Sequence, residues 1–113
     1  MEKFIYLFRG DMDHSQSNEE MQARTQKWLE WISQLRKSGI YLGGDPLVPT
    51  GKQLEGKKKT VTDGPFVESK EMVSGYIMIL AKDIDEAVEI SKGCPIFEVD
   101  GHLEVRPVQK LDM

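Results

Sequence analysis

The sequence predicts an α+β fold, a ferredoxin-like sandwich in which two helices cover one face of a four-stranded antiparallel sheet. Two segments, residues 4–8 and 73–80, alternate with the period of a strand and are apolar on both faces. Two further segments begin with helix-capping patterns. The segments follow one another as strand, helix, strand, then a hairpin, then helix, strand, which is the order of this fold.

Residues 4–8, with apolar side chains on both faces, predict a central strand. The helix that follows begins at a capping box made by Ser17 and Glu20, and Gly39 ends it. Its apolar residues fall at helical spacing and predict the buried face: Met21, Trp28, Ile32 and Leu35. We expect Trp28 to be buried and Trp31 to lie at the margin of the helix, in partial contact with solvent.

Residues 41–48 predict a short edge strand that is broken by Gly43-Gly44 and Asp45-Pro46. The lysine run 57–59 leads into residues 60–62, and charges of this kind protect an exposed edge from pairing with other chains. A solvated edge is therefore one interpretation of the lysine run, and a phosphate-binding patch is the alternative.

Residues 73–80 predict the second central strand, followed by a short helix capped by Asp83 and Glu86 and closed by Gly93 and Pro95. The stripe predicted to be buried on this helix consists of Ile84, Ala87, Val88 and Ser91. The last strand places Leu103 and Val105 on one face, and Pro107 indicates an edge. Its other face carries His102, Glu104 and Arg106.

The length of 113 residues predicts a single domain, residues 1–113. The N-terminal apolar run is short, reaches Arg9 and has no cleavage site after it, so we expect neither a signal peptide nor a membrane-spanning segment. The lone Cys94 predicts a reduced, cytoplasmic protein. A net charge of -4 argues against nucleic acid as a partner.

The two central strands leave an apolar sheet face that two helices cannot cover. Since monomers seldom expose a large continuous apolar patch, we expect a homodimer that packs sheet to sheet and encloses a cavity.

The stretch VTDGPFVESKE, residues 61–71, adds Pro65 and Phe66 to an Asp-Gly turn that would suffice for a hairpin. Together with LGGDPL and HLEVRPV it resembles the DGPF branch of the YciI-related proteins, over residues 4–108. The resemblance implies a dimeric α+β barrel with an enzymatic or ligand-binding role, and some relatives are fused to, or encoded beside, extracytoplasmic-function sigma factors.

The wider family includes a dehydrochlorinase-like activity that uses a histidine on the first helix and an aspartate. Residues 18–38 contain no histidine, so that pair is not carried over. The remaining candidates for acid–base catalysis are His14, Asp45 and Asp63. Each has a structural alternative: His14 as a solvated loop residue, and the two aspartates as turn residues that bond the backbone.

The predicted ligand-binding residues are Gly64, Pro65 and Phe66, which would form a rigid turn that presents Asp63, together with Arg106 and His102. A salt bridge with Glu104 is the alternative for Arg106. No spaced set of His or Cys residues supports a metal site, and we expect neither a metal nor another cofactor. Cys94 is expected to be a packed thiol.

Two classes of function follow from these residues. One is an enzyme that performs acid–base chemistry on a small molecule in a cleft of the dimer. The other is a ligand-binding or regulatory module without turnover, with a possible link to a sigma-factor system.

Overall fold

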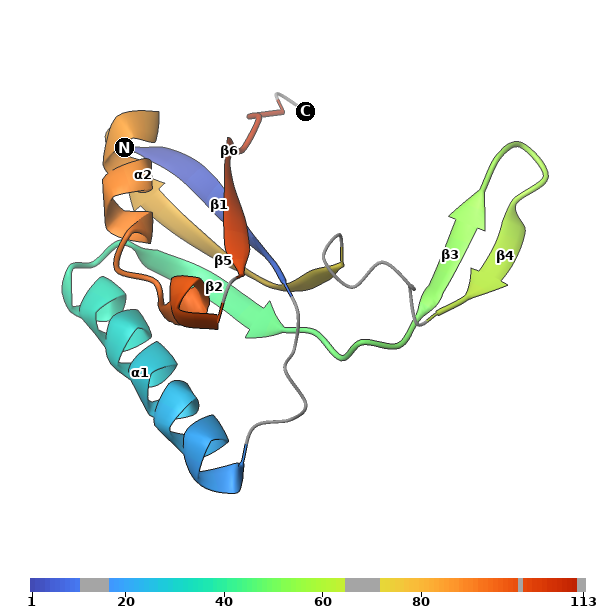
Figure 1. The fold of residues 1–113 in the computed structure, drawn as a ribbon. Helices are drawn as coiled ribbons and strands as arrows, with labels where there is room; N and C mark the ends of the chain where they lie inside the picture. Colours follow the sequence, from blue (N-terminus) through green and yellow to red (C-terminus); the bar gives the residue numbers. More distant parts are fainter. Residues whose placement is uncertain (11–16, 65–71, 100, 112–113) are drawn as a thin grey trace.

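The computed structural model describes residues 1–10, 17–64, 72–99 and 101–111. Across these residues an antiparallel sheet of four strands runs in the order β2-β5-β1-β6. The strands are β1 (Glu2–Arg9), β2 (Tyr41–Pro46), β5 (Val73–Ala81) and β6 (His102–Pro107). Helices α1 (Asn18–Lys37) and α2 (Ile84–Ser91) pack on one face, and the 3-10 helix η2 (Pro95–Val99) precedes β6 (Figure 1). The predicted α+β sandwich is confirmed.

Strands β1 and β5 are central and apolar on both faces, as predicted. In β1, Phe4, Tyr6 and Phe8 are buried toward the helices, while Ile5 and Leu7 are half-buried on the opposite face. The Tyr6 hydroxyl donates a 2.5 Å hydrogen bond to the Ala87 carbonyl and so ties the sheet to α2. We call the face opposite the helices the open face, and none of the residues that the structure describes covers it.

The helix side of the core is built around Trp31 and Leu35, the buried residues of α1. Trp31 stacks on Tyr6 with ring centroids 6.1 Å apart. Trp28 is half-buried and meets Phe8 edge to face at 5.0 Å. The predicted assignment of the two tryptophans is therefore wrong, because the inward stripe of α1 runs through residues 31 and 35. Met21, also expected inside, is 53% exposed.

Both predicted helix caps are present. The Ser17 side chain accepts a 3.2 Å hydrogen bond from the Glu20 N–H, and Gly39 adopts a φ of 75° just beyond the end of α1. The Asp83 carboxylate accepts from the Glu86 N–H at 2.9 Å. The buried stripe of α2 is narrower than predicted, since Ala87 and Ser91 are buried whereas Ile84 and Val88 are exposed.

Strand β2 continues through Gly43-Gly44, so the prediction that these glycines break it is wrong, whereas it does end at Asp45-Pro46 and does not resume at Leu47 and Val48. The pairing with β5 shifts register between Tyr41 and Gly43 instead. A Cβ atom on Gly44 would collide with the Tyr76 carbonyl oxygen. The glycine therefore lets the two backbones approach closely enough to pair.

A second, two-stranded sheet forms between β3 (Lys52–Glu55) and β4 (Thr60–Asp63). We call this hairpin the ribbon. It projects away from the sandwich beyond the end of β2 (Figure 1). The lysine run 57–59 lies in the turn at its tip, outside the four-stranded sheet. The lysine run is therefore at the exposed tip of a separate hairpin and not on an edge strand of the four-stranded sheet.

Candidate functional site

A cavity of about 430 Å³ lies between α1 and the ends of β2 and β5. Its walls are mostly apolar, and four of its lining residues are aromatic: Phe8, Trp28, Tyr41 and Tyr76. Polar residues also contribute to the lining: Arg24 and Thr25 from α1, and Asp45 from β2. Concave, largely apolar sites with a few polar groups are typical of small-molecule binding.

Asp45 and Tyr76, which also belong to the cavity lining, form a hydrogen-bonded pair. Their side chains lie on the open face, because Tyr76 pairs with Leu7 of β1 and alternates with Gly75 and Ile77, which face the helices. Asp45 and Tyr76 are directly opposite each other on β2 and β5, and the Tyr76 hydroxyl donates to Asp45 Oδ2 at 3.0 Å. This hydrogen bond, together with the negative charge of Asp45, raises the pKa of Tyr76. The phenol therefore keeps its proton and holds one oxygen of the carboxylate in place.

The glycines around the pair fix its position. Gly44 precedes Asp45, and Gly75 precedes Tyr76. A Cβ atom on Gly75 would lie 3.1 Å from the Asp45 carbonyl oxygen. The absence of side chains at both positions thus brings β2 and β5 together where the carboxylate and the phenol meet.

Asp63 lies elsewhere, at the end of β4 in the ribbon. It forms an ion pair with Lys52 Nζ at 2.5 Å, its side chain is 77% exposed, and it is not among the described residues that line the cavity. Gly64 donates its N–H to the Gly51 carbonyl at 2.7 Å and closes the base of the ribbon. His14, Pro65 and Phe66 lie outside the described residues, so their predicted roles stay predictions.

Arg106 and His102 lie on β6, where they alternate with Leu103 and Val105, which pack against the core. They consequently belong to the open face and not to the helix side. His102 is exposed there.

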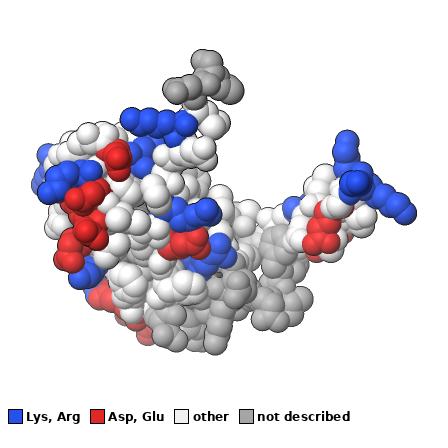
Figure 2. All heavy atoms as spheres, turned by 90° about the horizontal axis from the view of Figure 1, so that it is seen from above, with Lys and Arg blue, Asp and Glu red and all other residues white. Residues whose placement is uncertain are grey.

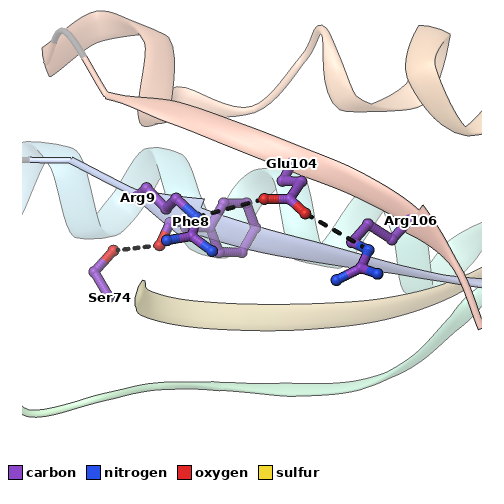
Figure 3. Close-up of polar contacts among 5 residues, drawn as sticks. All are labelled: Phe8, Arg9, Ser74, Glu104 and Arg106. Atoms are coloured by element: carbon purple, nitrogen blue, oxygen red, sulfur yellow. Dashed lines mark hydrogen bonds and ion pairs between the residues drawn. The ribbon is translucent and has the colours of Figure 1, made fainter. Parts of the chain in front are cut away.

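Figure 3 shows Glu104 between two arginines, and its carboxylate lies 3.6 Å from Arg9 Nε and 3.6 Å from Arg106 Nε. The adjacent Phe8 carbonyl accepts a 3.2 Å hydrogen bond from the Ser74 hydroxyl. The salt bridge that was the structural alternative for Arg106 is thus present. The predicted site residues fall into two places: the side chains of Asp45, Arg106 and His102 on the open face, and Asp63 and Gly64 in the ribbon.

No group of three His, Cys, Asp or Glu side chains in the described part of the chain is arranged to hold a metal ion. Cys94 is buried, and this burial raises the pKa of its thiol to about 12. The thiol therefore stays protonated at neutral pH, which does not suit a nucleophile. Among the helices described, none is long and apolar enough to cross a membrane.

Sequence reasoning did not find Tyr76, Tyr41, Trp28 or Arg24 as lining residues. Tyr76 was assigned only to a central strand, and its partnership with Asp45 depends on the register between β2 and β5. No pattern in a single sequence fixes that register. The glycines beside both residues were the available signal of close backbone approach.

The fold is similar to that of 5-chloro-2-hydroxyhydroquinone dehydrochlorinase from Burkholderia phenoliruptrix AC1100, solved in complex with 2,5-dihydroxybenzoquinone. The two chains are 16% identical, the match covers 95% of this chain and 93% of that chain, and the TM-score is 0.54. Among curated proteins, none matches this chain in sequence.

A family model, the YCII-related domain, matches residues 4–112. This match extends from the first residues of β1 to beyond the end of β6 and includes the whole cavity lining. The chain belongs to the YCII-related domain family.

Proposed function

We propose that this protein is an enzyme that moves protons on a small aromatic molecule carrying a hydroxyl group, and that Asp45 is the proton acceptor. The observation that carries the proposal is the exposed, hydrogen-bonded Asp45–Tyr76 pair, whose two residues also contribute to the lining of a mostly apolar cavity.

The aromatic lining supports a flat ligand. Trp28 and Tyr41 offer ring surfaces on which an aromatic molecule can stack or pack edge to face. Arg24 adds a cationic group to the same lining, suited to balance negative charge that develops on the ligand. A cavity of about 430 Å³ is within the size range of small-molecule sites.

The comparisons support the same class of ligand. The similar structure is that of a dehydrochlorinase solved in complex with a dihydroxylated quinone. The two chains share their fold at 16% identity, and we propose the same class of ligand for this chain.

In the proposed reaction Tyr76 has a positioning role. Its hydroxyl donates to Oδ2 of Asp45, which leaves Oδ1 to accept the proton from the hydroxyl group of the ligand. The phenolate takes up a proton from water at a ring carbon, Asp45 releases its proton to water, and loss of the original ring proton to water restores the aromatic ring. The pKa of Tyr76 is raised, so the phenol remains a donor while the carboxylate changes its protonation state.

Binding and proton transfer can be measured separately with 1,2,4-trihydroxybenzene as the probe, kept under nitrogen. Calorimetric titration measures affinity, and incorporation of deuterium at a ring carbon in D₂O measures proton transfer above the rate in buffer alone. We expect wild type to do both. Asp45→Asn should lower the exchange rate by about 100-fold or more, the usual effect of removing a general base.

Asp85→Asn is the matched control, because Asp85 is an exposed carboxylate on α2 outside the cavity lining. It should bind and exchange like wild type. Equal exchange by wild type and Asp45→Asn would contradict the proposed role of Asp45. Binding to wild type without exchange above background would favour the non-catalytic ligand-binding module. The same assays on Asp63→Asn test its predicted catalytic role.

A further inference from the structure

The ribbon has two chemically different faces. Cross-strand pairing places Lys52 opposite Asp63 and Leu54 opposite Val61. Because side chains alternate along a strand, these four residues share one face, which we call the docking face. The other face carries only uncharged polar residues and one carboxylate, at Gln53, Thr62, Thr60 and Glu55. The two apolar residues of the ribbon thus lie side by side on the docking face.

Nothing in the described part of this chain covers the docking face. Leu54 is 61% exposed and Val61 is 55% exposed, and the ribbon projects from the sandwich in both views (Figures 1 and 2). An isolated two-stranded hairpin is at best marginally stable in water. A ribbon with this pattern consequently needs another surface against its apolar pair.

The charge of the ribbon tip indicates which surface it fits. Lysines 57–59 form a basic tip, visible as a cluster of blue atoms at the far end of the molecule in Figure 2. The rest of the sequence contains 12 basic residues against 19 acidic ones. The main body of a second copy of this chain is therefore complementary in charge to the tip.

We propose that the ribbon docks on a second copy of this chain, with Leu54 and Val61 packed against the partner and the lysine tip near its carboxylates. Asp63 and Lys52 lie on the docking face and enter the same interface. The ribbon thereby brings the Asp63 carboxylate to the partner and not to the cavity of its own chain. This goes beyond sheet-to-sheet dimerisation because it assigns a separate contact to the ribbon.

The proposal is tested by the dissociation constant of the dimer, measured by analytical ultracentrifugation. Replacing both apolar residues, Leu54→Ser with Val61→Ser, should raise that constant by about tenfold or more, since buried apolar side chains are lost from an interface. The matched control, Gln53→Ser with Thr62→Ser, changes the opposite face and should leave the constant within about twofold of wild type. Both pairs are exposed in the single chain, so neither should prevent folding.

A fluorescent probe that responds to water shows where the face docks. Cys94, the one cysteine of the sequence, is buried, so a thiol introduced by Leu54→Cys or Gln53→Cys is labelled selectively. We expect the probe at position 54 to become shielded from solvent as the protein concentration rises, and the probe at position 53 to stay exposed to solvent. The proposal would be overturned by any of three results: a monomeric wild type, equal dissociation constants for the two double variants, or a probe at position 54 that is shielded from water at every protein concentration. The last result would mean that the ribbon docks on its own chain.

Discussion

Trp31 connects α1 to β1, because its ring stacks on Tyr6 and meets Phe8 nearly at right angles. It is only 6% exposed. We expect Trp31→Ala to lower the free energy of unfolding by about 3–5 kcal/mol through loss of packing and a residual cavity. Trp28→Ala should cost clearly less, because that ring is only half-buried. Denaturant unfolding monitored by circular dichroism measures both, and a larger loss for Trp28→Ala would contradict this description of the core.

The two tryptophans also show what residue patterns can and cannot determine. Trp28 and Trp31 are three residues apart, so both are close enough on a helix to face the same side. The pattern identified the apolar side of α1, but not which of its residues point most directly into the core, because this depends on how the helix is rotated about its axis. That rotation is decided by contacts with Tyr6 and Phe8, which are distant in sequence.

Asp45 illustrates the same limit at the candidate site. The glycine-marked turn signal identified it as a candidate, and the structure places it in the cavity lining. Its partner Tyr76 is 31 residues away and was not proposed. A single sequence can thus indicate a reactive side chain, but not the tertiary hydrogen bond that orients it.

At the level of elements, the pairing of β2 with β5 depends on Gly44. We expect Gly44→Ala to destabilise the protein by about 1–3 kcal/mol, because the added methyl group would collide with the Tyr76 carbonyl and the Ile77 side chain. The same strain should weaken binding of the aromatic probe, since Asp45 is the next residue. Thermal unfolding and calorimetric titration measure the two effects.

Gly51→Ala is the control for this prediction. A Cβ atom at Gly51 would meet no atom within 4 Å, and Gly51 has no positive φ. It should therefore leave both stability and binding nearly unchanged. If Gly44→Ala were as stable as Gly51→Ala, the pairing of β2 with β5 would not depend on the missing side chain at Gly44.

Elements with strong local signals were predicted well. The capping residues Ser17 and Asp83 and the alternation of β1 and β5 depend only on neighbours in sequence, and all were confirmed. The path of β2 through its glycines was not predicted correctly. Glycines normally interrupt strands, whereas here Gly44 is needed because the backbone of β5 approaches too closely for a side chain. The separation of the ribbon from the main sheet likewise has no local signal.

For the whole molecule, two buried acids predict loss of stability in alkali. Burial raises the pKa of Tyr6 above its ordinary value of 10.0, and that of Cys94 from 9.0 to about 12. Above about pH 9 the unfolded chain releases the thiol proton while the folded chain keeps it. The folded state then binds more protons, so the free energy of unfolding falls as pH rises.

This fall can be measured by urea unfolding between about pH 9 and 11. Cys94→Ala removes the thiol and should make the decline with pH shallower, although the variant starts from a lower stability because of the lost sulfur atom. An identical decline in wild type and Cys94→Ala would show that the thiol ionises equally in both states.

The central claim, that the cavity beside Asp45 and Tyr76 binds the substrate, is tested most directly by a crystal structure with 1,2,4-trihydroxybenzene. We predict density for the ring at the end of the cavity next to Asp45 and Tyr76, with a hydroxyl group within hydrogen-bonding distance of the Asp45 carboxylate. Density on the open face beside Arg106, with the cavity empty, would contradict it.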